Sequence, residues 1–257
     1  MKHSLKKWSI RLFATSILLV TILLVIVLKP ALTYAGHTRY GSFTIYHNAR
    51  IDPLLYQRLN DAKYLLSASE LYNPDTHFDI CLNDGSPYPS LIRTLRGPAF
   101  AWGFYDKVVL QGESDCRMNM VSLNGYKWDL TQLYAHELVH CMQFSALGLL
   151  HSNPLARIPE WKWEGYAEYI ARRSADQQRL AFNIKRLLDA DTIDKNSWAI
   201  SFPDHTIAPR TYYQYWILVQ YCLDVKKMSY KAVLADDHSE QHVYEDMMRW
   251  YTDADNS

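Results

Sequence analysis

The sequence has no excess of charge of either sign, because its 257 residues include 27 Lys plus Arg and 27 Asp plus Glu. A nucleic-acid-binding protein normally carries a basic excess or a basic stripe. We therefore expect no nucleic acid among the partners. Internal repeats and low-complexity tracts are also missing. The hydrophobic share is 49%, which is enough for a sizeable core in one large domain or two small ones.

Cysteine is scarce, with four residues and no CxxC spacing. This pattern argues against a zinc site built from cysteines. Cys81 and Cys116 fall in loop-like or strand-like sequence and could form a disulfide in an oxidising compartment. Cys141 and Cys222 lie in helix-like apolar segments and are expected to be buried thiols. Four cysteines allow three complete pairings, and the spacing alone does not choose among them.

Only one apolar run is long enough to cross a bilayer. It covers residues 12–28, is uncharged, and ends at Lys29-Pro30. A helix of this length spans roughly 25 Å, close to the hydrocarbon thickness of a membrane. The run exceeds the usual apolar region of a cleavable signal peptide. We therefore predict an uncleaved signal anchor, and the alternative is a signal peptide cut after Thr33-Tyr34-Ala35.

The charges that flank this run predict its orientation. Four basic residues precede the apolar run, and the first twenty positions after it contain only two, Lys29 and Arg39. The positive-inside rule then places the N-terminus in the cytoplasm and the rest of the chain across the membrane. We expect a cytoplasmic tail and anchor at 1–30, a polar linker at 31–40 and one catalytic domain at 41–257.

Apolar periodicity predicts an α+β fold in which strands come before helices. Strands are expected at 42–47 and 77–82, a helix at 53–69 capped by Asp52, and a hairpin at 99–111 that turns near Tyr105-Asp106. From Asp129 onward the pattern is mostly helical, with helices expected at 130–147, 161–174, 176–189, 211–226 and 241–252. The expected architecture is a transmembrane helix, a small mixed or antiparallel sheet with one or more helices, and a mainly helical, zincin-like C-terminal part.

Residues 136–140 read His-Glu-Leu-Val-His, an HExxH motif. Histidines four residues apart project from one face of a helix and can share one zinc ion. Glu137 lies beside the first of them and can act as the base that takes a proton from water. Because HExxH alone is only a moderate signal, a third ligand is required to support a catalytic zinc site.

Glu164 is the candidate for that third ligand. It follows His140 by 24 residues, which leaves room for one helix to end at Asn153-Pro154 and Ile158-Pro159 and for a second helix to return. Glu168 lies one helical turn further on, where a carboxylate can accept the distal N–H of a ligand histidine. The predicted metal ligands are therefore His136, His140 and Glu164, and Glu168 is the predicted hydrogen-bond partner of a ligand histidine.

His136 to His140, followed by Pro159-x-Trp161-x-x-Glu164-Gly165-x-Ala167-Glu168-Tyr169, resembles the gluzincin clan of zinc metallopeptidases. In particular, it is similar to a bacterial group with the second motif P-x-W-x-x-E-G-x-A-E-Y. The resemblance covers residues 136–169 and implies one zinc ion, a peptide or protein substrate, and a bacterial inner-membrane location with the catalytic domain on the periplasmic or extracellular side. Small residues at 165 and 167 would let the second helix approach the first.

The resemblance also implies a donor that stabilises the oxyanion of the tetrahedral intermediate. Tyr212 occupies a Y-x-Q pattern at the start of a downstream helix and is the candidate, with Tyr213, Tyr215 and His205 as rivals. Core packing explains these tyrosines about equally well. Two further hypotheses remain open. One is a membrane-tethered binding or scaffold protein without catalysis, and the other is an intramembrane protease, which the polar residues of 130–150 disfavour.

Overall fold

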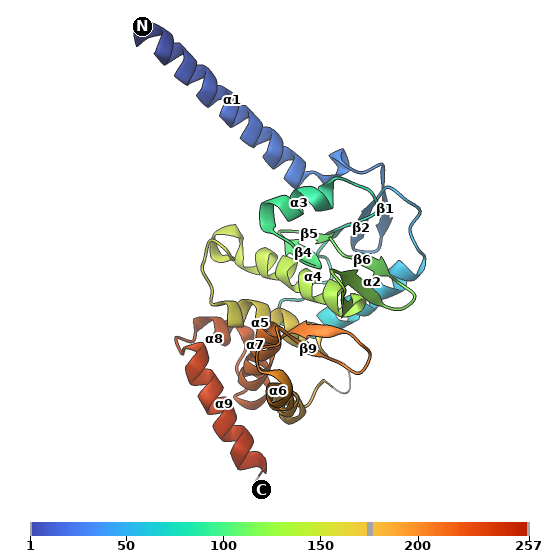
Figure 1. Cartoon of the computed structure of the whole chain (residues 1–257), viewed down its shortest axis with the longest axis vertical. Helices are drawn as coiled ribbons and strands as arrows, with labels where there is room; N and C mark the ends of the chain where they lie inside the picture. Colours follow the sequence, from blue (N-terminus) through green and yellow to red (C-terminus); the bar gives the residue numbers. More distant parts are fainter. Residues whose placement is uncertain (1, 174–176, 256–257) are drawn as a thin grey trace.

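The computed structural model describes residues 2–173 and 177–255 and confirms the α+β fold. Helix α1 (Lys2–Leu28) extends away from the remaining elements, which pack together (Figure 1). Its segment Arg11–Leu28 has a mean hydropathy of 2.6 and is long and apolar enough to cross a membrane. The strands and α4 form the half of the packed region next to α1, and the C-terminal helices form the other half (Figure 1).

A mixed five-stranded sheet lies in the first half, as predicted. Its strands in spatial order are β1 (Gly36–Tyr40), β2 (Phe43–His47), β3 (Phe78–Cys81), β5 (Lys107–Leu110) and β4 (Ala101–Phe104). The three central strands are parallel, whereas β1 and β4 pair antiparallel with their neighbours. The hairpin of β4 and β5 turns at Tyr105 and Asp106, as expected, and leaves β4 at the edge of the sheet.

Alternation along the strands gives the sheet two buried faces. Ile80 and Val108 belong to the main core, which also contains α2 (Leu54–Leu66) and α4 (Leu130–Leu147). Their neighbours in sequence, Cys81 and Val109, belong to a second cluster on the other face of the sheet. Helix α3 (Tyr88–Arg96) contributes Tyr88 and Ile92 to that second cluster.

An antiparallel sheet of three short strands leads into α4. It consists of β6 (Glu113–Asp115), β7 (Met120–Leu123) and β8 (Tyr126–Asp129). Asp129 caps α4 as predicted, because its side chain accepts a hydrogen bond of 2.8 Å from the backbone N–H of Gln132. Gly148 ends the helix with a φ of 77°, a conformation that glycine adopts without strain.

The C-terminal half is mainly helical. Its elements are α5 (Glu160–Ala171), α6 (Leu180–Asp194), α7 (Arg210–Gln220) with a π-helical turn (Tyr221–Val225), α8 (Tyr230–Ala235), α9 (Glu240–Asp255) and the hairpin of β9 (Ala199–Ser201) and β10 (Ile207–Pro209). The predicted helix at 161–174 ends at Ala171, and the one at 176–189 begins later, at Leu180. Positions 174 and 176 lie outside the described residues. Helices α3 and α8 and strands β6 to β10 were not predicted, because short elements carry weak periodicity.

One sequence-based expectation is wrong, and one possibility that the sequence left open is not realised. Residues 31–40, expected to be a linker, contain most of a 3₁₀ turn (Pro30–Leu32) and all of β1. Cys81 and Cys116 do not form a disulfide, and all four cysteines are buried free thiols. The 3₁₀ turn was missed because three residues give no periodic signal, and β1 because its burial alternates only between half-buried and exposed positions.

Candidate metal centre

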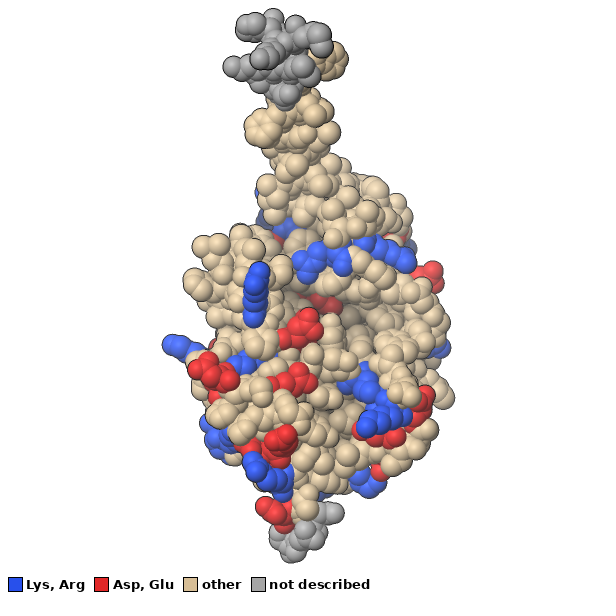
Figure 2. Space-filling view, turned by 60° about the vertical axis from the view of Figure 1, so that its left-hand side comes forward, with Lys and Arg blue, Asp and Glu red and all other residues tan. Residues whose placement is uncertain are grey.

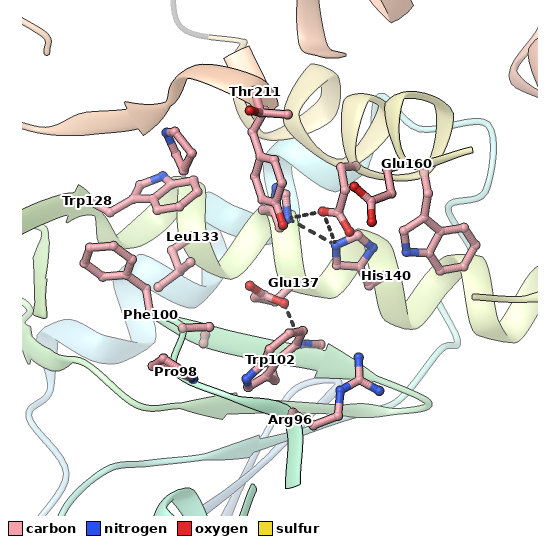
Figure 3. Close-up of a pocket in the computed structure, with 18 of the residues that line it drawn as sticks. Arg96, Pro98, Phe100, Trp102, Trp128, Leu133, Glu137, His140, Glu160 and Thr211 are labelled. Atoms are coloured by element: carbon pink, nitrogen blue, oxygen red, sulfur yellow. Dashed lines mark hydrogen bonds and ion pairs between the residues drawn. The ribbon is translucent and has the colours of Figure 1, made fainter. Parts of the chain in front are cut away.

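Helices α4 and α5 bring together the three predicted ligands. His136 and His140 project from one face of α4, and their Nε2 atoms lie 3.1 Å apart. Oε2 of Glu164, from α5, lies 3.3 Å from the first nitrogen and 3.1 Å from the second. Dashed lines in Figure 3 mark contacts of this cluster. Three donor atoms from two helices therefore converge on one point.

The size of this triangle fits a metal ion. Zinc–nitrogen and zinc–oxygen bonds of about 2.0–2.1 Å at tetrahedral angles separate neighbouring ligand atoms by about 3.3 Å. The three observed separations lie between 3.1 and 3.3 Å. Side chains of the two histidines are almost fully buried, whereas that of Glu164 is 18% exposed. The two histidines are therefore shielded from solvent, and solvent reaches the centre on the side of Glu164.

The tautomer of His140 is set by its neighbour Gln143. The Gln143 amide nitrogen donates hydrogen bonds to the carbonyl of Trp163 at 3.0 Å and to the hydroxyl of Tyr230 at 2.8 Å. Its amide oxygen is therefore free to accept from Nδ1 of His140, at 2.8 Å. In the neutral ring this leaves the Nε2 lone pair of His140 directed at the other ligand atoms, as metal coordination requires.

Glu168 faces the other ring nitrogen of His136. Its Oε1 lies 3.2 Å from Nδ1 of that ring, and its Oε2 accepts a hydrogen bond from Nε of Arg172. Arg172 also donates to Gln132 at 3.0 Å and is almost fully buried. Burial alone would raise the pKa of Glu168, but Arg172 and His136 together lower it. The carboxylate therefore stays ionised and orients the imidazole.

The electrostatic balance of the cluster favours a cation. Burial would lower the pKa of His136, but hydrogen bonds to Glu164 and Glu168 raise it to about 10. The pKa of Glu164 is lowered, because the two histidines outweigh the effect of burial. If both imidazoles are neutral, the Nε2 lone pairs of His136 and His140 and the carboxylate of Glu164 point toward one another and repel. A divalent ion among them removes this repulsion, so the donor set fits a metal.

Glu137 lies on the opposite side of the cluster from α5, against strand β4 (Figure 3). Its Oε2 accepts a hydrogen bond from the backbone N–H of Gly103. Burial raises the pKa of this carboxyl, and the nearby His136 and His140 act in the opposite direction. A Cβ atom at position 103 would lie 2.2 Å from the Glu137 carbonyl oxygen, so only glycine permits this approach. The edge strand thus holds the carboxylate in place.

The cluster opens into a cleft of about 1330 Å³ between the two halves of the molecule. Figure 2 shows this hollow with acidic side chains inside and beside it and basic side chains above and below. Trp102 lies below Glu137 and Phe100 lies to its left in Figure 3, and Glu160 lies on the other side, above His140. Such a depression can hold an extended chain across the cluster.

Tyr212 is the member of the candidate oxyanion group that lines the cleft. Its ring stacks on that of His136, with centroids 5.9 Å apart and planes 10° apart. Burial, followed by the nearby carboxylates Glu164 and Glu137, raises the pKa of Tyr212, so its hydroxyl keeps its proton. The rivals do not line the cleft. Tyr213 and Tyr215 are buried, and His205 is exposed elsewhere.

The expected role of Gly165 is wrong in one respect. A Cβ atom there would lie 2.5 Å from the carbonyl oxygen of Tyr215, so Gly165 allows α5 to approach α7 rather than α4. Sequence reasoning also missed Gln143, Arg172 and Gly103. The first two had a usable signal, because they follow His140 and Glu168 by three and four residues on the same helical face. Gly103 had none.

Comparison with known proteins does not assign a family. A scan against protein-family models found no match. A search of curated proteins also found none.

Proposed function

We propose that this chain is a membrane-anchored zinc peptidase of the gluzincin type. The convergence of two Nε2 atoms and one carboxylate oxygen on a point in an open cleft supports this proposal most strongly. The residues at this point have the order, spacing and partners that a catalytic zinc site requires, namely three protein ligands and one open position. A peptide or protein is the expected substrate.

In the proposed mechanism, His136, His140 and Glu164 would hold one zinc ion. Such an ion would supply Lewis-acid chemistry, which activates water and polarises a carbonyl. Glu137 takes the proton of the attacking water and passes it to the leaving amine, and its raised pKa suits this exchange. Tyr212 donates a hydrogen bond to the developing oxyanion.

The N-terminal helix is proposed to be an uncleaved anchor. Tyr34, within the alternative cleavage site, is buried in the second core cluster. Its hydroxyl donates to the Leu82 carbonyl at 2.8 Å. Cleavage after Ala35 would remove this buried ring from the folded domain. The charge pattern then favours a cytoplasmic N-terminus and a catalytic domain on the periplasmic or extracellular side of a bacterial inner membrane.

A set of three matched substitutions tests the proposal. Glu137→Gln should keep the metal and abolish hydrolysis, whereas Glu164→Gln should lower zinc content. Glu113→Gln, an exposed carboxylate on β6 that does not line the cleft, should alter neither. Zinc is measured by elemental analysis and hydrolysis with a mixed-sequence peptide library. Full hydrolysis by Glu137→Gln would rule out its role as the base.

The same experiment distinguishes a peptidase from a scaffold protein without catalysis. A tethered scaffold protein would bind zinc without hydrolysis. Closure of the site by cysteine is disfavoured, because Sγ of Cys141 lies 3.4 Å from the Lys107 carbonyl in the core. An intramembrane protease is also disfavoured. Within residues 2–173 and 177–255, only the segment Arg11–Leu28 qualifies as a membrane span, and α4 instead packs among α2, β4 and α5.

A further inference from the structure

The apolar helix enters the folded domain without a flexible connection. Val27, in its last turn, is half-buried and packs against the second core cluster. The backbone carbonyl of Val27 accepts a hydrogen bond of 2.6 Å from the hydroxyl of Tyr88. Two residues after the end of the helix, Pro30 is already buried. The final turn of α1 is thus part of the domain.

The residues that follow are held equally firmly. The carbonyl of Thr33 accepts a hydrogen bond of 2.9 Å from the hydroxyl of Ser86. Tyr34 is buried beside Tyr88, with ring centroids 6.1 Å apart. Backbone and side-chain contacts therefore fix the chain continuously from Val27 to β1. An anchor joined in this way sets both the height and the orientation of the domain relative to the bilayer.

Helix α3 connects the anchor to the cleft. Tyr88, which binds the Val27 carbonyl, is its first residue, and Arg96, which lines the cleft, is its last. The guanidinium of Arg96 lies over the ring of Trp102 on β4, 4.6 Å from its centroid. The rise of a nine-residue helix plus one tyrosine side chain places the edge of the cleft within about 20 Å of the end of the anchor.

The surface along this path carries positive charge. Lys29, Arg93 and Arg96 are exposed. Figure 2 shows basic side chains on the face between the base of α1 and the hollow. Anionic lipid headgroups attract exposed basic groups of this kind. This charge favours a domain that lies against the bilayer surface rather than one that extends away from it.

We infer that the cleft acts on extended segments of other membrane-anchored polypeptides, close to the point where they leave the bilayer. This inference rests on the proposed peptidase function and on the anchor. An extended chain covers 20 Å with about 6 residues. The reactive window is therefore expected to begin about 6 residues from the membrane. Substrates confined to the same bilayer gain in effective concentration, but only when the tether reaches the site.

The placement is tested first, independently of catalysis. The full-length protein is reconstituted in vesicles with an energy-transfer acceptor on the lipid headgroups. A fluorescent donor is attached at Thr94→Cys on α3 or, as a control, at Glu245→Cys on α9, at the opposite end of the molecule (Figure 1). Strong transfer from α3 and weak transfer from α9 is expected. Equal transfer from both positions would overturn the placement, whether or not the protein is a peptidase.

The substrate class is tested with one cleavable sequence in several settings. It is placed about 6, 12 and 30 extended residues from a single membrane span, and also supplied as a soluble peptide. Cleavage should be greatest at the two short distances, and at the longest distance about fourfold slower than at 12 residues. A rate independent of distance would overturn the inference while leaving the peptidase proposal intact. Absence of hydrolysis in every setting would instead refute the peptidase.

A variant with a loosened anchor provides the matched control. A flexible Gly/Ser insertion of about 15 residues after Lys29 frees the domain but leaves residues 30–34 in place. It should retain activity on the soluble peptide and cleave the distant site as well as the near ones. Tyr88→Phe, which removes only the hydroxyl bonded to Val27, should widen the window to a smaller extent. An unchanged window after the insertion would contradict the role of the rigid connection.

Discussion

The substitution Gly103→Ala tests whether the close approach of β4 to α4 holds the proposed base. A methyl group at this position would lie 2.2 Å from the Glu137 carbonyl oxygen and 2.9 Å from its side-chain Oε2. Ordinary contacts begin at 3.4 Å, so the strand must move by more than 1 Å. This movement would break the hydrogen bond from the Gly103 N–H to the carboxylate.

Both stability and activity should fall. Overpacking of this kind costs about 1–3 kcal/mol. For a domain of this size each kcal/mol lowers the melting temperature by about 2–4 °C, so a decrease of about 2–12 °C is expected. Because Glu137 is not a metal ligand in the proposed site, zinc content should change little while peptide hydrolysis decreases strongly. Calorimetry, elemental analysis and the peptide assay measure the three quantities.

Gly36→Ala on β1 is the matched control. A Cβ atom there meets its nearest neighbour, the ring of His47, at 3.6 Å, which is an ordinary contact. It should therefore melt within about 1 °C of the native protein, as substitutions without such clashes usually do. If Gly103→Ala keeps the native melting temperature and activity, the proposed contact between β4 and Glu137 is refuted.

Three further outcomes are expected. Arg172→Met should weaken zinc affinity about 10–100-fold because Glu168 loses its partner, whereas Lys185→Met, an exposed control, should not; equal affinities measured by competition with a chelator would contradict this. All four thiols should resist alkylation in the native protein at pH 8 and react after unfolding, since burial raises the pKa of Cys116 to about 11; rapid native labelling would argue against buried thiols. Burial and Asp224 raise the pKa of Tyr169 to about 12, so its stabilising contribution is complete below pH about 10 and is lost between pH 10 and 12. In Tyr169→Phe the melting temperature should therefore decrease less between pH 10 and 12 than in the native protein. An identical decrease in both proteins would refute the assignment.

Local pattern predicted the elements that carry the ligands. His136 and His140 are four residues apart on a helix with a capping Asp129 and a terminal Gly148, so their shared face followed from helical geometry alone. The alternating strands were predicted for the same reason, because burial on both sides of a sheet leaves a period of two in the sequence. Motif spacing predicted Glu164 as the third ligand, and the structure brings it to the other two.

Contacts between distant residues could not be predicted in this way. Gly103 precedes Glu137 by 34 residues, and Tyr88 follows Val27 by 61, so neither pair leaves a periodic trace in the chain. Such contacts depend on how the sheet, α3 and α4 pack, which is decided by the summed burial of many side chains. The absence of a linker is the clearest example, because the polar composition of residues 31–40 conceals the packing of their backbone.

The sequence by itself therefore determined which residues are candidates to bind a metal, since side-chain identity and helical spacing are local properties. The tertiary structure decided how these candidates are arranged. It placed the three ligand atoms 3.1–3.3 Å apart, positioned Glu137 against an edge strand, and joined the cleft to the apolar helix through α3. These relations arise only when segments far apart in the chain exclude water from one another, which no short stretch of sequence can specify.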